Sequence, residues 1–358
     1  MAKKPTPFGA LAGPPVSGPA FFDRETELAA LDRAITTGGK VLLVGPRRSG
    51  KTSLLHQARR RLGEAGATRN PLHLDLSGAS ARASAVRILA LAAQQAPHAR
   101  EVAAATPEAE LLAALQAALR HRVAEGPGRL VLFIDEIGAP LAPDDAERQL
   151  WRNLIAALAD IAGLTVIASL DTRVFDALGA PKGFDIIRIK PWDADVVRRA
   201  ATAWARAERM PSELVDAIVE RLSPAWPMEL MRLLLEIPRN GPPTERALDA
   251  LIDRQARDIS YEEAVQRLAT TTLRKRDEHL IRLILSALAD RKDGATPEAV
   301  AQSAVEQKAQ PSDILRLARW LANLDLISLD AKSHRMRAPT ALAWHSLRRG
   351  LGLQDKTA

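Results

Sequence analysis

The sequence predicts an α/β fold in which a mainly parallel sheet carries helices on both faces and is followed by an all-α lid and a winged-helix domain. Between residues 21 and 190, five short apolar runs alternate with stretches of helical periodicity, a pattern typical of buried parallel strands joined by helices. Beyond Pro191 the apolar runs give way to helical segments broken by prolines, which predicts a change of architecture there. The strand candidates are residues 41–44, 72–76, 129–135, 164–169 and 184–189.

Composition limits the class of protein before any motif is considered. The chain of 358 residues is long enough for two or three domains, and no apolar run approaches the roughly 18 residues that a membrane-spanning helix needs. It contains no cysteine, which excludes disulfides and thiolate chemistry and fits a cytoplasmic location. The net charge of +7 and the pI near 10.0 favour contact with nucleic acid, although the basic excess is spread along the chain.

The predicted organisation has five parts. A proline-rich and flexible lead-in, residues 1–20, precedes the α/β domain of residues 21–190. Residues 191–268 predict a helical lid and a connecting helix. Residues 269–347 predict three helices and a hairpin, which is the outline of a winged helix, and residues 348–358 form a tail.

The segment that follows the first strand candidate matches the P-loop pattern G-x-x-x-x-G-K-[ST] completely. Glycine-bearing turns let backbone N–H groups converge on phosphate oxygens, Lys51 reaches the β and γ phosphates, and Thr52 ligates Mg²⁺. Because a strand precedes the motif and a helix follows it, the sequence predicts the parallel sheet of a P-loop nucleoside triphosphatase that binds ATP or ADP. The expected nucleotide-binding residues are Gly45, Pro46, Arg47, Arg48, Ser49, Gly50, Lys51, Thr52 and Ser53.

Two arginines within this loop, Arg47 and Arg48, are not needed to cradle phosphate. We expect them on the exposed crest of the loop, where they either meet a lid, a neighbouring subunit or the winged helix, or are simply solvated.

A second motif lies at the end of the strand candidate 129–135, where Asp135 is followed by Glu136. An acid at the tip of a buried strand can hold Mg²⁺ through water, together with Thr52, and the adjacent glutamate can polarise an attacking water. The sequence therefore predicts hydrolysis of ATP to ADP and phosphate, with Lys51, Asp135 and Glu136 as catalytic residues.

The strand candidate 164–169 is expected beside the P-loop strand, so residues at its tip would face the γ-phosphate. Ser169, Asp171 and Arg173 are the candidates for sensing this phosphate. The alternative is that Asp171 and Thr172 only cap the helix that follows.

Several motifs in order resemble a known family: FFDRETELAALDRAI, GPRRSGKTSLL, LHLDLSG, LFIDE and SLDTR. From Phe21 to Leu347 the chain is similar to archaeal-type ATPases of the STAND and initiator-related branch of the AAA+ superfamily. This resemblance implies a helical lid, a C-terminal winged helix, and an N-terminal segment that places Phe22 and Arg24 near the adenine.

The chain departs from this family at two points. It has Ala225-Trp226-Pro227 where the lid of such proteins often carries Gly-x-Pro. No arginine finger stands out among Arg148, Arg152 and Arg173.

The last helical segment before the hairpin, residues 311–323, would be the recognition helix of the winged helix. Ile314, Leu317, Ala318 and Leu321 form its expected buried stripe. The expected DNA contacts are Arg316, Arg319, Lys332, Arg335 and Arg337. The alternative is a winged helix that serves protein contacts and whose charges are solvated.

These predictions combine into a cytoplasmic Mg²⁺-dependent ATPase. Its nucleotide state would control assembly on double-stranded DNA or on a protein partner, with a nucleotide-dependent homo-oligomer as one form. The alternative function is a slow signalling switch, held closed by ADP, that does not bind DNA.

Overall fold

The computed structural model describes residues 21–64, 71–93, 106–125, 130–138, 144–237, 243–259, 265, 274–303 and 309–351. The predicted lead-in, and parts of the predicted connecting helix and tail, lie outside these residues. The described chain divides into two compact units, residues 21–190 and residues 191–351.

The first unit is built on a five-stranded parallel sheet with the strand order β2-β3-β4-β1-β5. The predicted parallel sheet is confirmed, and the strand that follows the acidic motif in sequence lies beside the P-loop strand as expected. The strands are β1 (Lys40–Gly45), β2 (Pro71–Asp75), β3 (Leu130–Asp135), β4 (Leu164–Asp171) and β5 (Asp185–Arg188).

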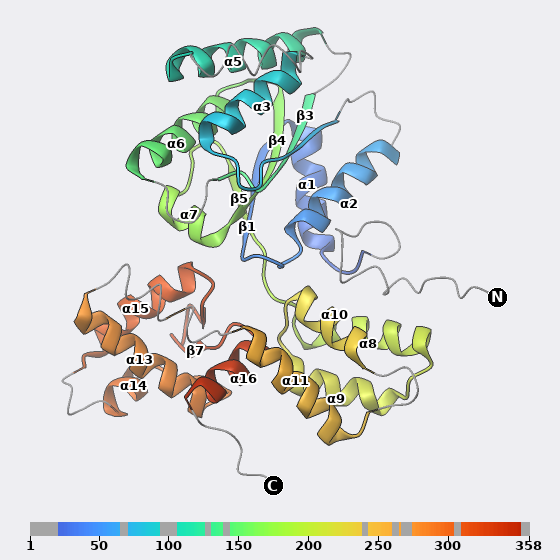
Figure 1. Cartoon of the computed structure of the whole chain (residues 1–358), viewed down its shortest axis with the longest axis vertical. Helices are drawn as coiled ribbons and strands as arrows, with labels where there is room; N and C mark the ends of the chain where they lie inside the picture. The colour runs from blue at the N-terminus through green and yellow to red at the C-terminus, as the bar shows by residue number, and fades with distance from the viewer. Residues whose placement is uncertain are drawn as a thin grey trace. The chain divides into compact units, whose positions relative to one another are not determined.

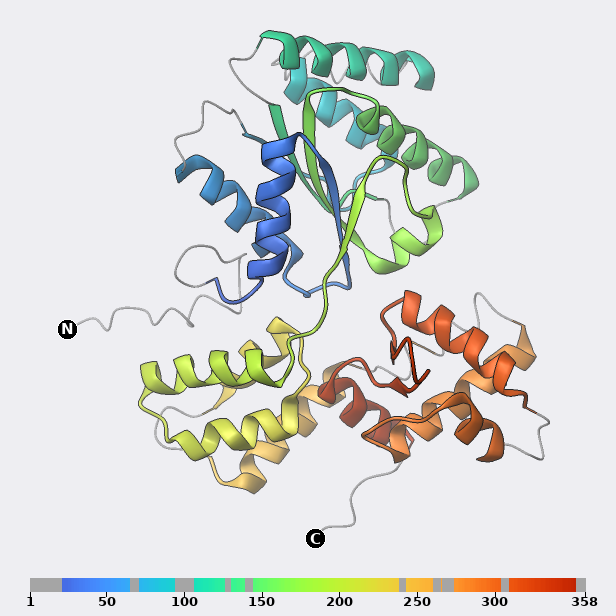
Figure 2. The same ribbon diagram turned by 180° about the vertical axis from the view of Figure 1, so that it is seen from behind.

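Helices cover both faces of this sheet, as Figures 1 and 2 show from opposite sides. One face carries α1 (Glu25–Thr37) and α2 (Lys51–Glu64). The other carries α3 (Ala81–Ala93), α5 (Glu108–Glu125), α6 (Asp145–Ala159) and α7 (Thr172–Leu178).

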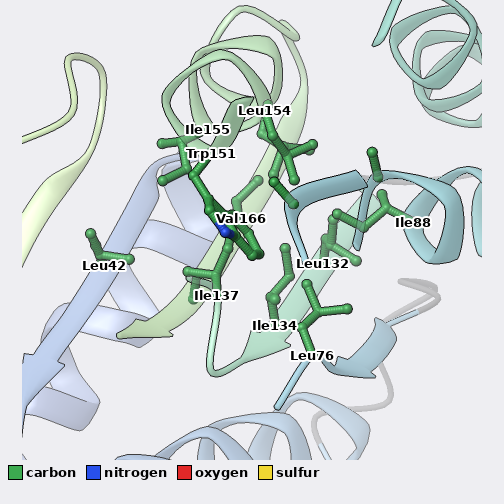
Figure 3. Packing of buried hydrophobic residues seen from close by; sticks show 14 of the residues in the cluster. Leu42, Leu76, Ile88, Leu132, Ile134, Ile137, Trp151, Leu154, Ile155 and Val166 are labelled. Carbon is green, nitrogen blue, oxygen red and sulfur yellow. The ribbon is translucent and has the colours of Figure 1, made fainter. Parts of the chain in front are cut away.

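The core on the second face explains why both strand and helix residues are apolar there. Trp151 of α6 is fully buried and packs with side chains of β3 and β4, among them Leu132 and Val166 (Figure 3). Helix α6 begins where the carboxylate of Asp144 accepts a 2.7 Å hydrogen bond from the Glu147 N–H. Burial of apolar area on this face holds the carboxyl ends of β3 and β4 at one edge of the sheet.

The second unit is mainly helical. It begins with α8 (Ala194–Glu208), α9 (Ser212–Leu222), α10 (Pro227–Glu236) and α11 (Glu245–Ile259). It continues with α13 (Lys275–Asp290), α14 (Pro297–Ser303), α15 (Pro311–Asn323) and α16 (Ala341–Gly350). Two short antiparallel strands, β6 (Ser328–Leu329) and β7 (Met336–Arg337), stand where the hairpin was predicted. The sequence analysis did not predict α16.

One carboxylate within this unit connects α10 with α16. An oxygen of Glu229 accepts a 2.7 Å hydrogen bond from the backbone N–H of Trp226, which caps the first turn of α10. Its other oxygen accepts a 3.1 Å hydrogen bond from the hydroxyl of Thr340, the N-cap residue of α16. The backbone N–H of Ala341 also donates to the carbonyl of Pro224, so the starts of the two helices are held together twice.

Within the described residues, no helix combines the length and the apolar character needed to cross a membrane.

Candidate nucleotide-binding site

The P-loop connects the end of β1 to the start of α2. The left-handed backbone of Arg48 and Gly50, with φ angles of 67° and 96°, turns the loop back on itself. A side chain at Gly45 would lie 2.9 Å from the Ser49 hydroxyl and 3.1 Å from Ile189, so close packing requires glycine there. Arg47 and Arg48 are exposed, whereas Ser49 is fully buried. The two arginines thus lie on the outside of the loop.

The amine of Lys51 is held inside the loop by the loop itself. Its Nζ donates to the carbonyl oxygens of Gly45 at 2.8 Å and Pro46 at 2.9 Å, and the residue is 6% exposed. Burial lowers the pKa of Lys51, and the carboxylates of Asp171, Glu136 and Asp135 act in the opposite direction. A phosphate entering the loop would exchange carbonyl partners of this amine for phosphate oxygens.

Asp135 and Glu136 lie where β3 ends, and a serine of β4 bonds the carboxylate of the first and the backbone of the second. The hydroxyl of Ser169 donates to Asp135 Oδ1 at 2.5 Å and accepts a 2.9 Å hydrogen bond from the Glu136 N–H. The Ser169 carbonyl accepts a further 2.8 Å bond from the N–H of Ile137. Glu136 itself adopts a left-handed backbone with φ 51° and is half-buried. The Ser169 hydroxyl therefore holds both the Asp135 carboxylate and the backbone of Glu136.

The structure gives the three sensor candidates different surroundings. The buried hydroxyl of Ser169 bonds the carboxylate of Asp135, at the end of β3, and the backbone N–H of Glu136, which follows it. Asp171 is the N-cap of α7, because its Oδ1 accepts from the Arg173 N–H at 3.0 Å, and Arg173 Nε also contacts this oxygen at 3.2 Å. Thr172 is buried as the first residue of α7 and is not the cap.

The N-terminal segment uses its arginine inside the fold. Arg24 is the N-cap residue of α1 in a left-handed conformation, and its guanidinium donates to the carbonyl of Lys190 at 2.7 Å and pairs with Glu27 at 3.1 Å. Arg24 is 8% exposed. Its bond to the Lys190 carbonyl links the start of α1 to the segment that follows β5. Phe22, two residues before Arg24, is half-buried.

The three arginines considered as fingers each have a partner in the chain. Arg152 donates to the carbonyls of Leu178 at 3.0 Å and Ala177 at 3.2 Å, at the carboxyl end of α7. Arg148 pairs with Asp145 of its own helix, and Arg173 pairs with the Asp171 carboxylate.

The residues that would hold Mg²⁺ are oxygen donors, which fits this cation. Among the described residues, no cluster of three or more His, Cys, Asp or Glu is arranged to hold a metal ion. Mg²⁺ does not require one, because it keeps several waters and binds through one or two protein oxygens together with substrate phosphates. Thr52, in the first turn of α2, and Asp135, at the end of β3, supply such oxygens at the P-loop edge of the sheet.

The predicted DNA-contact residues lie in the second unit and differ in how far they are engaged. The buried stripe of α15 is confirmed. Three of these five side chains form hydrogen bonds or ion pairs with other residues of the chain. Arg316 pairs with Asp277 at 2.6 Å, while Arg335 and Arg337 donate to the turn carbonyls of 293–294. Lys332 and Arg319 are exposed on the hairpin and on α15.

Together, the parallel sheet, the P-loop and the two acids define a P-loop nucleotide-binding α/β domain. Residues 20–167 match the family model described as AAA ATPase domain, so this part of the chain is similar to that domain.

The whole chain is also similar to solved structures. The Walker-type ATPase paby2304 of Pyrococcus abyssi aligns with a TM-score of 0.65 and 16% identity, over 94% of this chain and 98% of that chain. A variant of RuvB from Thermotoga maritima aligns with 17% identity and a TM-score of 0.42, over 96% and 99% of the two chains. DnaA from Aquifex aeolicus, bound to AMPPCP, aligns with 14% identity and a TM-score of 0.40, over 85% and 90%. No curated protein matches this chain. The first of these alignments shows a shared fold.

Proposed function

We propose that this protein is a Mg²⁺-dependent ATPase whose nucleotide state controls assembly on double-stranded DNA or on a protein partner. The observation that carries the proposal is that Asp135 and Glu136, joined by Ser169 through the Asp135 carboxylate and the Glu136 backbone, lie at the same edge of the sheet as the P-loop lysine. A domain that only binds nucleotide does not require a glutamate beside the loop.

Each residue of the site has a role in this proposal. The loop N–H groups of residues 45–51 and the amine of Lys51 bind the phosphates. Thr52 and Asp135 hold Mg²⁺, which neutralises charge on the transferred phosphoryl group. Glu136 accepts a hydrogen bond from the attacking water and orients it. Ser169 keeps the Asp135 carboxylate and the backbone of Glu136 in place.

The link from the nucleotide to the second unit is proposed to pass through the segment after β5. Arg24 holds the carbonyl of Lys190, the last residue of the first unit. Because the resemblance places Phe22 and Arg24 near the adenine, nucleotide binding there would act directly on the start of the connection to residue 191. A ligand shifts such an arrangement only through contacts that differ between its states.

The second unit is proposed to comprise a helical lid and a winged helix, as in the STAND and initiator-related branch of AAA+ ATPases, in a cytoplasmic protein. The net charge of +7 supports contact with DNA. Arg319 and Lys332, which are exposed on α15 and on the hairpin, are the candidates for this contact.

A second function is favoured by the other basic side chains. Arg316 pairs with Asp277, which offsets its charge, and Arg335 and Arg337 donate to turn carbonyls, which occupies guanidinium N–H groups that could otherwise contact phosphate. This favours a slow switch that is held closed by ADP and does not bind DNA.

An ATPase assay with and without double-stranded DNA, on protein separated by size, tests the proposal. Hydrolysis that DNA stimulates, in a fraction larger than the monomer, supports the first function. Tightly bound ADP in the purified protein, with no DNA affinity at low salt, supports the switch. For the DNA contact itself, Arg319→Ala with Lys332→Ala should weaken binding and reduce its salt dependence, while Arg246→Ala, an exposed arginine of α11, should not.

A further inference from the structure

The two oxygens of the Asp171 carboxylate differ in their hydrogen bonding among the described residues. Oδ1 accepts both hydrogen bonds from Arg173 and so accounts for the cap of α7. Oδ2 is buried, and no hydrogen-bond donor of the described residues reaches it. A buried carboxylate oxygen without a donor is costly, so its presence calls for a reason beyond capping.

The place of Asp171 in the sheet puts this carboxylate at the phosphate end of the site. Residue 171 is the register partner of Gly45, the first glycine of the P-loop, on the neighbouring strand β4. Adjacent strands lie about 4.8 Å apart, so the side chain begins one strand spacing from the loop that would receive the phosphates.

The charge of Asp171 acts on the amine that would bind those phosphates. Burial is the largest influence on Lys51 and lowers its pKa. Among the carboxylates that oppose this effect, Asp171 has a larger influence than Glu136 or Asp135. Asp171 is therefore one of the carboxylates that offset the charge of the P-loop amine.

We infer that Asp171 is a specificity-determining residue of the nucleotide site, which disfavours ATP relative to ADP. The inference rests on the proposed nucleotide-binding function. The carboxylate compensates the amine of Lys51 when no nucleotide is bound. The γ-phosphate brings additional negative charge toward the same amine, and the two anions repel each other. ADP lacks this phosphate and escapes most of the repulsion.

The substitution Asp171→Asn separates charge from structure. Asparagine caps a helix as well as aspartate does, and it retains an oxygen for the Arg173 N–H. Binding of Mg²⁺-ATP and Mg²⁺-ADP is measured by calorimetry in a Glu136→Gln background, so that ATP is not consumed. We expect ATP to bind about tenfold more tightly relative to ADP, a change of about 1.4 kcal/mol.

Two further variants keep the test independent of folding and of Arg173. Asp171→Ser also supplies a capping oxygen without charge and should shift the ratio of the two affinities in the same direction. Arg173→Gln, combined with Asp171→Asn, should leave the shift in place. If the shift disappears in this combination, Arg173 is responsible for it and the inference is wrong.

A matched control is Asp144→Asn, which alters the N-cap of α6 in the same unit and should leave the ratio unchanged. An unchanged ratio in Asp171→Asn, or an equal weakening of both nucleotides, would overturn the inference while leaving the nucleotide site intact. Failure of the parent protein to bind either nucleotide would overturn the proposed function, and this inference with it.

Discussion

Replacing Glu229 with glutamine should make the stability of the second unit less dependent on pH. Burial raises the pKa of Glu229 to about 7 from its usual 4.5, against the opposing hydrogen bonds from the Trp226 N–H and the Thr340 hydroxyl. Because the folded pKa lies above the unfolded one, the folded state holds this proton more tightly. The stability it provides is complete below pH 4.5 and is lost as the pH rises through 7. The loss amounts to about 3 kcal/mol.

Glutamine in place of Glu229 keeps an acceptor for Trp226 and can donate to Thr340, but it has no charge to bury. We therefore expect Glu229→Gln to match the parent near pH 5 and to be more stable by up to about 3 kcal/mol near pH 8. Burial lowers the pKa of His345 in the same unit, which makes stability rise with pH. That contribution cancels when the variant is compared with the parent at each pH.

Urea denaturation followed by tryptophan fluorescence at pH 5, 6, 7 and 8 measures this difference, because five of the six tryptophans lie in residues 191–358. Glu213→Gln, at an exposed position in the first turn of α9, is the matched control and should show no such trend. The reasoning is refuted if the variant and the parent depend equally on pH, or if the variant becomes relatively less stable as the pH rises.

Two further predictions concern the hydroxyl that fixes the acids and a glycine beside the hairpin. Ser169→Ala removes the hydrogen bond to Asp135 and should slow ATP hydrolysis by about 10–100-fold with little change in nucleotide affinity, whereas Thr165→Val, at a buried position of the same strand, should not. Steady-state kinetics measure the rate of hydrolysis, and calorimetry measures nucleotide affinity. Equal rates in Ser169→Ala and the parent would refute a role of the Ser169 hydroxyl in hydrolysis. Gly294→Ala should cost more than about 1 kcal/mol, because φ is 87° and the new side chain would lie 2.0 Å from a backbone oxygen of β7. Gly63→Ala, within α2 and with no atom inside 4 Å, should be neutral or stabilising, and thermal melts that rank the two glycines the other way would contradict the packing.

The parts of the fold that the sequence predicted are those that depend on local pattern. Apolar runs with helical segments between them specify parallel strands, and the P-loop specifies a strand, a turn and a helix within about 25 residues. For this reason the sheet and the neighbouring positions of β1 and β4 could be predicted without knowledge of tertiary contacts.

Long-range contacts account for what the sequence did not predict. The carbonyl of Lys190 binds the guanidinium of Arg24, 166 residues away in sequence, and no local pattern indicates such a bond. The pairing of Glu229 with Thr340 spans 111 residues. Helix α16 follows the hairpin, and the sequence analysis predicted no helix there. A signal was present for Ser169, a polar residue near the end of a mainly apolar strand, but its bond to Asp135 depends on the order of the strands.

The central claim is that Asp135 and Glu136 make this nucleotide site hydrolytic, and the rate of ATP turnover by Glu136→Gln tests it most directly. Lys51→Ala serves as the reference that should lose nucleotide binding altogether. The account predicts that Glu136→Gln binds ATP about as tightly as the parent and hydrolyses it at least about 100-fold more slowly. Turnover by Glu136→Gln at the parent rate would contradict it.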